Sequence, residues 1–323
     1  MRILGTGSAL PKNIVSNDDL AQIMDTSDEW IRTRTGIETR HIAVEETTTS
    51  LSIAAAQSAL EAANLQAEDI DLILASTVSG DNVIPMLSCE VQAALGAKKA
   101  VAFDLGVACS GFLFALATAD AYFSTGRFKT ALLIGAETLS KLMDWNDRGT
   151  CVLFGDGAGA AVVSAEANDI WGMVQGSDGT GGMALQCQNR PVRNPFKSKE
   201  HWDEAMRLPY VQMNGPEVYK FAVRTVPNAI QEALDQAGIT ADEVDCFVLH
   251  QANIRIIESV AKRLQQPMEK FPTNLQECGN ISAASVPILL DKICKEDKIK
   301  KGDKIVLAGF GAGLTWGACV IGW

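Results

Sequence analysis

The chain is poor in histidine, in aromatic residues and in positive charge. Only three histidines occur among 323 residues, and aromatic residues make up 6% of the total. The 28 lysines and arginines are outnumbered by 39 acidic residues, which gives a formal net charge of -11. Because a general nucleic-acid-binding protein needs a basic surface, this composition argues against one. It leaves room for a local basic patch that attracts an acidic partner.

The chain also lacks paired cysteines and long hydrophobic runs. Its eight cysteines include no C-x-x-C pair, so their spacing indicates no zinc or other metal site, and their apolar settings favour reduced thiols. The N-terminus lacks the continuous apolar segment of a secretory signal peptide. The apolar run at residues 308–323 is too short and too glycine-rich to cross a membrane. We therefore expect a cytoplasmic protein with no membrane or nucleic-acid partner.

What the chain does contain is an internal repeat. Residues 57–74 align with residues 231–248 at an offset of 174, and residues 131–135 align with residues 305–309 at the same offset. Each copy has the pattern of a helix, a short acidic loop and a buried strand. Alternating helical and β-branched apolar segments predict an α/β fold whose strands are covered on both faces. We expect two similar halves, residues 1–167 and 168–323, that share one core.

Cys109 has the surroundings of a nucleophile. It follows an apolar run that predicts a strand and precedes an apolar helix, with Gly106 and Gly111 on either side. The unpaired N–H groups at a helix N-terminus favour a thiolate over a thiol. The alternative is a core cysteine, because free cysteine is among the most buried residue types. Partners elsewhere in the chain must decide between the two.

Two residues of the second half are candidate partners of Cys109. His250 ends the repeated strand, and the carboxyl ends of strands face the crevice where α/β proteins bind ligands. Asn280 lies in a Gly/Asn turn that the repeat places beside the Cys109 turn. A core histidine, and an asparagine kept for its turn or capping geometry, are the alternatives. His41 and His201 have surface-like neighbours, and we interpret both as structural.

An ordered set of motifs then carries a resemblance that covers essentially the whole chain. The segments DLGVACSGF, HQANIR and GNISAASVP, which contain Cys109, His250 and Asn280, resemble the Cys, His and Asn motifs of β-ketoacyl-acyl-carrier-protein synthase III. The segments SDEWIRTRTGI, DRGT, FGDGAGAA and GAGLTWG resemble further parts of that family. The resemblance implies the thiolase fold, with duplicated βαβαβαββ halves in a five-layered αβαβα sandwich, which agrees with the repeat.

The resemblance implies the condensation that initiates fatty acid biosynthesis. An acyl-CoA primer, which we expect to be acetyl-CoA, would join malonyl-acyl-carrier protein and release CoA and CO2. Cys109 would hold the acyl group, and the backbone N–H groups of Cys109 and Ala312 would form the oxyanion hole. His250 and Asn280 would stabilise the enolate that decarboxylation leaves. No cofactor is implied, since acyl-CoA is a substrate.

Substrate-binding residues are also implied by the resemblance. Trp30 and Arg148 would hold the adenine of CoA between them, since a flat base stacks on indole and guanidinium. The expected CoA-binding set is Trp30, Arg34, Thr35, Arg148, Tyr219 and Asn253. The expected carrier-protein-binding set is Gln251, Arg255, Lys220, Lys262 and Arg263. A helix-packing aromatic, a turn-stabilising ion pair and a solvated charged face are the corresponding alternatives.

Two positions depart from the family pattern. Ala312 replaces the middle glycine of a Gly-Gly-Gly run, and its backbone donor survives only if its φ is negative. Ile84 stands where members often have Phe, a residue that caps the primer pocket of the partner in a homodimer. A smaller cap would admit a longer or branched primer.

Four other functions remain to be weighed. A condensing enzyme of secondary metabolism, of polyketide or quinolone type, or an acyltransferase that does not decarboxylate, could use the same residues. A scaffold that only binds acyl-CoA or carrier protein would form no acyl-enzyme. An NAD-dependent oxidoreductase is disfavoured because the glycine-rich segments lack the G-x-G-x-x-G spacing.

Overall fold

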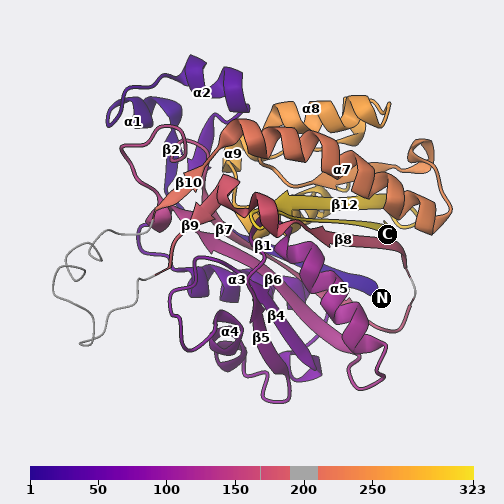
Figure 1. Cartoon of the computed structure of the whole chain (residues 1–323). Coiled ribbons are helices and arrows are strands. Elements are labelled where there is room, and N and C mark those ends of the chain that lie inside the picture. Colours follow the sequence, from indigo (N-terminus) through magenta and orange to yellow (C-terminus); the bar gives the residue numbers. More distant parts are fainter. Residues whose placement is uncertain (168, 190–209) are drawn as a thin grey trace.

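Two separate β-sheets form the framework of the molecule (Figure 1). The computed structural model describes residues 1–167, 169–189 and 210–323. The first sheet has five strands in the order β1-β7-β6-β4-β5. Their bounds are β1 (Arg2–Ala9), β4 (Leu72–Ser76), β5 (Val101–Leu105), β6 (Thr130–Thr138) and β7 (Asp156–Ser164).

The second sheet has four strands, all from the C-terminal half, in the order β11-β12-β13-β8. These are β8 (Ile170–Ser177), β11 (Cys246–Leu249), β12 (Lys304–Gly311) and β13 (Thr315–Gly322). β11 and β12 run parallel, whereas β13 is antiparallel to both of its neighbours. Two small ribbons complete the strands: β2 (Ile14–Ser16) with β3 (Thr39–His41), and β9 (Leu185–Cys187) with β10 (Val211–Met213).

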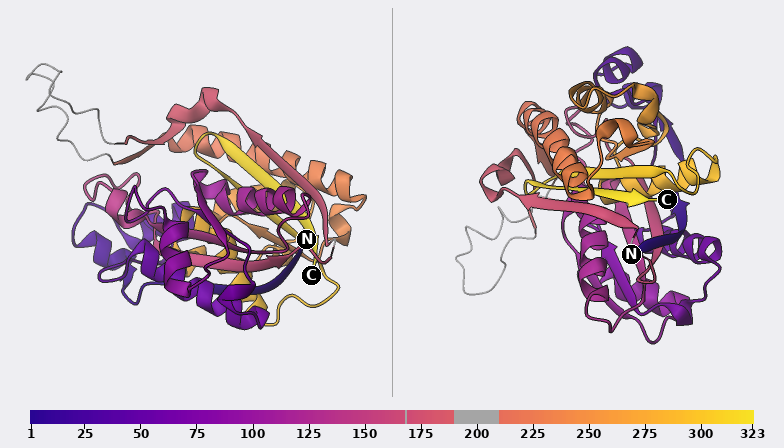
Figure 2. Two further views of the ribbon diagram at one scale, coloured as in Figure 1. Left: turned by 90° about the horizontal axis from the view of Figure 1, so that it is seen from below. Right: turned by 90° about the vertical axis from the view of Figure 1, so that its right-hand side faces the viewer.

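Helices lie outside and between the two sheets, as Figures 1 and 2 show. The outer face of the first sheet packs on α3 (Thr48–Ala63) and α4 (Leu87–Leu95), and that of the second on α7 (Gly215–Ala237) and α8 (Ile254–Arg263). Between the sheets lie α5 (Gly111–Phe123) and α10 (Ser285–Lys295). β4 shows why: Leu72 and Leu74 face the middle layer, while Ile73 and Ala75 face α3. The five-layered αβαβα sandwich predicted from the sequence is confirmed.

The 174-residue repeat is visible in the structure. β4 and β11, α5 and α10, and β6 and β12 each begin 174 residues apart. The short 3-10 turns η2 (Ala108–Ser110) and η7 (Ser282–Ala284), which precede α5 and α10, are related in the same way. The halves are not strand-for-strand copies: the segment equivalent to β5 is the short helix α9 (Leu275–Cys278), which ends at Gly279 with φ +65°.

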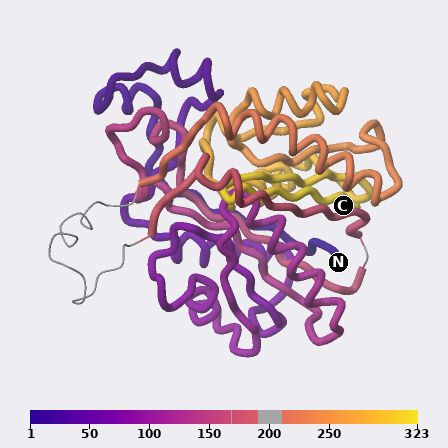
Figure 3. Tube along the Cα trace, viewed as in Figure 1, coloured from indigo at the N-terminus to yellow at the C-terminus, as the bar shows by residue number. Residues whose placement is uncertain are grey.

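The first half reaches across to the second through its N-terminal helices. α2 (Asp28–Thr35), which packs on α1 (Asn17–Ala21), lies beside α8, where the indigo and orange parts of the trace meet (Figure 3). The Arg255 guanidinium of α8 donates to the Thr33 carbonyl at 2.6 Å. The side chain of Asn253, which caps α8, donates to the Arg34 carbonyl at 3.0 Å. These contacts tie the end of α2 to the start of α8.

Two sequence expectations fall near the junction of the halves. The expected boundary at residues 167/168 lies between β7, which ends at Ser164, and β8, which begins at Ile170. The β9–β10 ribbon follows β8, and His201, which we interpret as structural, lies outside the described residues. Within the described ranges, no helix is long and apolar enough to cross a membrane.

Candidate active site

Cys109 lies in η2 at the N-terminal end of α5, as the sequence predicts. The preceding residue, Ala108, has the unusual φ of +46°, so the chain turns sharply before the cysteine. Gly111 packs against Ser76 so closely that a side chain there would clash with the Ser76 hydroxyl. This tight packing against β4 holds the cysteine at the carboxyl ends of the strands, where it is 6% exposed.

The surroundings of Cys109 favour the thiol form over the thiolate. Burial raises its pKa to about 12, a hydrogen bond with Ser282 lowers it, and the charge of Glu137 raises it further. These effects count against the resting thiolate that the helix N-terminus would favour. Loss of water outweighs the helix N-terminus here, so the sulfur must lose its proton as it attacks.

The loop after β12 lies directly against Cys109. A Cβ atom added to Gly311 would lie 2.7 Å from the Cys109 Cβ, so no larger residue fits. Ala312, in contrast, keeps a negative φ, so its backbone conformation suits alanine. Thr315 donates to the Ala312 carbonyl at 3.0 Å, and its hydroxyl lies 3.0 Å from that of Ser110. These bonds fix the Ala312 peptide relative to the nucleophile turn.

His250 follows β11 and is 2% exposed. Its backbone N–H donates to the Ala308 carbonyl at 2.8 Å, and its ring meets the edge of the Phe310 ring with centroids 5.3 Å apart. Burial lowers the pKa of His250 to about 3, so the ring is neutral at neutral pH. Its Nδ1 atom is buried with no hydrogen-bond partner among the described residues. A neutral ring with one N–H can donate to a negative oxygen.

Asn280 is held by bonds to both its backbone and its side chain. Its N–H donates to the Leu153 carbonyl at 2.8 Å, and its carbonyl accepts from Gly155 at 3.0 Å. Its Oδ1 accepts from the Ser282 N–H at 2.9 Å. Because the oxygen of the side-chain amide is occupied, the Nδ2 group is left as a donor.

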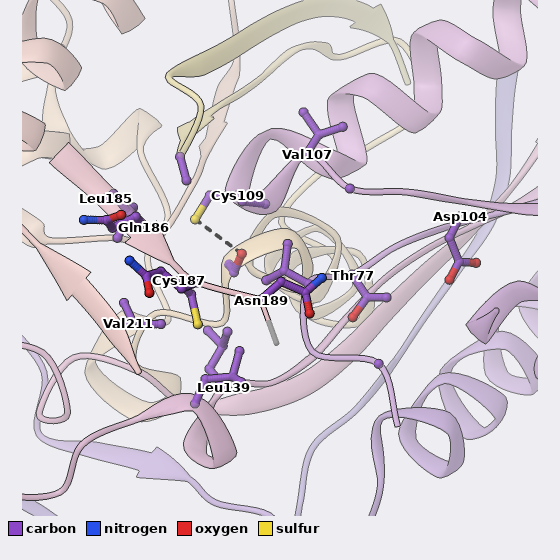
Figure 4. Close-up of a pocket in the computed structure, with 18 of the residues that line it drawn as sticks. Thr77, Asp104, Val107, Cys109, Leu139, Leu185, Gln186, Cys187, Asn189 and Val211 are labelled. Atoms are coloured by element: carbon purple, nitrogen blue, oxygen red, sulfur yellow. Dashed lines mark hydrogen bonds between the residues drawn. The ribbon is translucent and has the colours of Figure 1, made fainter. Parts of the chain in front are cut away.

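Shared neighbours bring the three residues together. Ser282 contacts both Asn280 and Cys109, whose sulfur lies 3.4 Å from the Ser282 hydroxyl (dashed line in Figure 4). The end of β12 contacts both His250 and Cys109, because Phe310 packs on His250 and the adjacent Gly311 packs on Cys109. The predicted Cys-His-Asn set therefore converges on one end of the second sheet.

Cys109 opens into a cavity of about 1010 Å³. Figure 4 shows Cys109 at one wall, with Leu139 and Cys187 among the other lining residues. Ile84, expected at the primer pocket, lines the same cavity and is 87% exposed. The cavity is thus bounded on one side by a solvent-exposed loop, and none of the residues that the structure describes covers Ile84.

The residues expected around the adenine of CoA form a stacked cluster. The Arg34 and Arg148 guanidinium carbons lie 4.7 Å and 5.1 Å from the centre of the Trp30 ring. Arg148 also donates to the Asp25 carbonyl at 2.5 Å. A base held between Trp30 and Arg148 would need about 7 Å, or two van der Waals separations. An adenine must therefore displace one of the guanidinium groups.

The other expected CoA-binding residues differ in what they offer. Tyr219 on α7 is 41% exposed, and Asn253 lies where α8 meets α2. Thr35 is buried, and its hydroxyl donates to the Ile31 carbonyl and accepts from the Ile37 N–H. Both hydrogen bonds of the Thr35 hydroxyl are therefore made inside the protein, and its expected place at the CoA entrance stays a prediction.

The expected basic stripe lies on one face of α8. Arg255, Lys262 and Arg263 are exposed, as is Lys220 on the adjacent α7. Arg263 donates hydrogen bonds to Val223 and Asn228 of α7, so the basic stripe extends from α8 to α7. Gln251 does not belong to it: this residue is 1% exposed and bonds to Leu249 and Asn274. Its side chain supports the loop after β11 and offers no contact to a carrier protein.

The structure adds residues that the sequence interpretation missed. Ser282 and Glu137 interact with Cys109, and Phe310 packs on His250. Glu137 is a single acidic residue at the end of an otherwise apolar run, and this pattern could have drawn attention to it in the sequence. His41, interpreted as structural, bonds to the Pro11 carbonyl at 2.6 Å. Within the described ranges, no cluster of side chains has the composition of a metal site.

Two family models match the chain. The model for "3-Oxoacyl-[acyl-carrier-protein (ACP)] synthase III" covers residues 103–179, and that for the C terminal of the same enzyme covers residues 234–323. A "Beta-ketoacyl-[acyl-carrier-protein] synthase III" of Clostridium acetobutylicum is 47% identical over 100% of this chain and 98% of its own length.

Solved structures give the same picture. The 3-oxoacyl-[acyl-carrier-protein] synthase III of Aquifex aeolicus VF5 matches with a TM-score of 0.92 and 44% identity, over 100% of this chain and 99% of that one. The priming β-ketosynthase of the R1128 polyketide biosynthetic pathway has a TM-score of 0.91 at 36% identity, over 99% of this chain and 95% of that one. The identity to the Aquifex aeolicus enzyme is therefore higher than that to the polyketide enzyme.

Proposed function

Because this chain belongs to the β-ketoacyl-[acyl-carrier-protein] synthase III family, we propose a role for each residue around Cys109 in the reaction of that family. The chain is an initiating condensing enzyme of fatty acid synthesis. It joins an acyl-CoA primer to malonyl-acyl-carrier protein and releases CoA and CO2. The observation that carries the assignment of roles is the convergence of Cys109, His250 and Asn280 around Ser282 and the end of β12.

Acylation is the first step. The sulfur of Cys109 attacks the thioester carbon of acyl-CoA, and the carbonyl oxygen becomes an oxyanion between the N–H groups of Cys109 and Ala312. The negative φ of Ala312 and its Thr315 bond support this use of its peptide. The tetrahedral intermediate expels the CoA thiolate, a good leaving group that needs no strong acid. The acyl group stays on the sulfur.

Decarboxylation and condensation follow. The malonyl thioester loses CO2, and the electron pair left on its α-carbon is shared with the thioester oxygen as an enolate. The neutral His250 ring and the Nδ2 group of Asn280 donate to that oxygen. The α-carbon then attacks the acyl carbon, and the Cys109 thiolate leaves. Because loss of CO2 generates the carbanion, the step needs no prosthetic group.

Two surfaces are proposed for the larger substrates. The Trp30, Arg34 and Arg148 cluster would stack on the adenine of CoA, as its planar and cationic groups suit a flat base. The stripe of Arg255, Lys262 and Arg263, with Lys220, would attract the acidic carrier protein. Because the chain as a whole has a net charge of -11, an acidic partner would be attracted to this basic surface and repelled elsewhere.

A second copy of the chain would complete the primer cavity. β5 is an edge strand, and Val101 on it is 47% exposed. The nearby Val83 and Ile84 are 76% and 87% exposed, an unusual amount for aliphatic side chains close together in one loop. A homodimer that covers this face would remove the open edge and close the cavity beside Ile84. Sedimentation equilibrium measures the mass, and a monomer at micromolar concentration would exclude it.

Mass spectrometry tests the assignment of Cys109. Incubation with acetyl-CoA should leave one acetyl group on the intact protein, and peptide mapping should place it on Cys109, because this sulfur faces the oxyanion hole. The Cys109→Ser variant should stay unmodified. The mapped peptide matters because Cys187 is exposed and lines the same cavity. Acetylation of Cys187 instead, or no adduct with any short acyl-CoA, would overturn the assignment.

The same assay separates the two chemical steps. Asn280→Ala should keep acylation of Cys109 but lose release of CO2 from malonyl-acyl-carrier protein by roughly a hundredfold or more, since it removes one donor to the enolate. Loss of acylation in this variant would assign Asn280 a different role. If the protein were instead an acyltransferase that does not decarboxylate, the wild-type protein itself would release no CO2.

A further inference from the structure

Glu137 is a buried carboxyl that the steps above leave unused. It lies near the end of β6, is fully buried, and forms no ion pair within the part of the chain that the structure describes. Its carboxylate accepts hydrogen bonds from the Ser79 hydroxyl at 2.5 Å and the Val78 N–H at 3.1 Å. A carboxyl buried without a cation is costly to the fold, which calls for an explanation at this position beside the cavity.

The hydroxyl of Ser282 stands between Glu137 and Cys109. Its oxygen lies 3.4 Å from the Cys109 sulfur, and its interaction with the Glu137 carboxylate lowers the pKa of that carboxyl. Ser282 is 3% exposed, and its own N–H is bound to Asn280. A hydroxyl can accept one hydrogen bond while it donates another, so Ser282 has the chemistry to pass a proton from Cys109 toward Glu137.

We propose that Ser282 and Glu137 relay and store the proton of the Cys109 thiol while Cys109 carries the acyl group; the proposal rests on the role of Cys109 given above. As the sulfur bonds to the thioester carbon, its proton passes to the Ser282 oxygen, and the Ser282 proton passes to Glu137. The CoA thiolate leaves and takes a proton from water. When condensation expels the Cys109 thiolate, Glu137 returns its proton through Ser282. One proton is consumed per cycle, and it ends on CoA.

The electrostatics of the site favour this sequence. Burial raises the pKa of Glu137 to about 7, so the carboxyl can exist in either form near neutral pH. The negative charge of Glu137 in turn raises the pKa of Cys109. A thiolate beside an ionised Glu137 is therefore disfavoured, and transfer of the proton onto Glu137 removes that repulsion as the sulfur reacts. Only one negative charge occupies the site at a time.

The groups that face Glu137 come from three elements. Thr77, Val78 and Ser79 of the loop after β4 provide hydroxyls and a backbone amide, and Ser282 comes from η7. Among the described residues that interact with Glu137, the titratable one is Cys109 of η2. The pH dependence of Cys109 acylation is therefore a direct readout of Glu137.

Single-turnover kinetics test the relay. The rate of acyl-Cys109 formation from acetyl-CoA is measured by quenched-flow mass spectrometry between about pH 6 and pH 9 in the wild type, Ser282→Ala, Glu137→Gln and the double variant. Alanine suits the backbone at residue 282, because Ala108 in the equivalent turn has the same φ of +46°. Each single variant should lose about a hundredfold at neutral pH, the usual size of a proton-transfer contribution.

Three features separate a relay from a structural role. The rate of each variant should rise with pH across the range, whereas the wild-type rate levels off, and the double variant should be no slower than the singles. Asp291→Asn, which removes another buried carboxyl bound to Thr6 and Ser8, is the control and should keep the wild-type pH profile.

The failures are distinguishable. Variants that match the wild type, lose the same factor at every pH, or combine additively would overturn the relay while the wild type is still acylated on Cys109. A wild type that forms no acyl-Cys109 would overturn the proposed function and the relay together. Thermal unfolding of each variant shows that it is folded before its rate is compared.

Discussion

At the scale of single residues, the loop at 311–313 shows which glycines the site needs. The sequence raised a doubt at Ala312, where the family pattern has glycine. The structure answers it: Ala312 has a negative φ, whereas Gly311 leaves no room for a side chain beside Cys109. Gly313 has φ +138°, which only glycine adopts readily. The lack of space therefore requires glycine at 311, the positive φ requires it at 313, and neither requires it at 312.

Paired substitutions test this distinction. Gly311→Ala should lower the rate of Cys109 acylation at least tenfold, because its Cβ would lie 2.7 Å from the Cys109 Cβ and push the sulfur from its place. Ala312→Gly should change the rate by less than about threefold, since the peptide keeps its Thr315 bond. Single-turnover acylation measures both. Equal losses in the two variants would contradict the geometric argument.

The candidate site was predictable in its residue types and less so in its surroundings. Cys109, His250 and Asn280 stand out because each follows a strand or turn that the repeat brings to one edge. The sequence did not show that Gln251 and Thr35 are buried, because sequence position does not reveal that a polar side chain points inward to backbone partners. Ser282 and Glu137 were missed because their link to Cys109 crosses between η7, β6 and η2, segments far apart in the chain.

At the scale of elements, α8 joins two parts of the site. Its N-terminus is tied to α2 by Asn253 and Arg255, and its exposed face carries the basic stripe. Arg255 and Arg263 both bond to neighbouring helices through backbone carbonyls or Asn228. Lys262 is the member of the stripe for which the described contacts include no such bond, so it is the cleanest position at which to vary charge alone.

Reversal of charge at Lys262 tests the stripe. Lys262→Glu should raise the KM for malonyl-acyl-carrier protein several-fold, more at low salt than at high salt, because surface attraction is screened by ions. Acylation of Cys109 by acetyl-CoA should be unchanged. Glu258→Lys, a reversal of opposite sign on the same helix, serves as the comparison and should lower that KM or leave it unaltered. An unchanged KM for the carrier protein in Lys262→Glu would place the docking surface elsewhere.

The layered fold was predictable because the sequence repeats itself and its strands are apolar on both faces. The helix and strand pairs that begin 174 residues apart follow directly from that repeat. The difference at β5 and α9 did not follow, since it depends on a four-residue helix ended by Gly279. The crossing of α1 and α2 onto the second half is a tertiary contact, made through backbone carbonyls, that carries no local sequence signal.

At the scale of the whole molecule, Glu137 links the site to the stability of the fold. Burial raises its pKa from 4.5 to about 7, so the folded protein prefers the protonated carboxyl. The stabilisation from that preference is fully present below about pH 4.5 and is lost as the pH rises through about 7. A neutral side chain at this position would not lose this stabilisation as the pH rises.

Chemical denaturation tests this relation without reference to activity. The free energy of unfolding of Glu137→Gln, relative to the wild type, should increase by a few kcal/mol between about pH 5 and pH 8, since each pKa unit corresponds to about 1.4 kcal/mol. Urea unfolding at the two pH values measures the difference. A difference that does not vary with pH would show that Glu137 is not buried as a neutral acid.

The matched turns of Ala108 and Ser282 show how the site could arise from a duplicated gene. Both residues have φ +46°, they lie 174 positions apart, and the second turn contacts the nucleophile that follows the first. In a symmetric ancestor made of two identical halves, every such turn would face its own copy across the axis. Duplication frees the two copies to diverge, so that one turn keeps the reactive sulfur and the other becomes its hydroxyl neighbour. The asymmetry of the chemistry thus lies in the side chains, on two turns of the same backbone conformation.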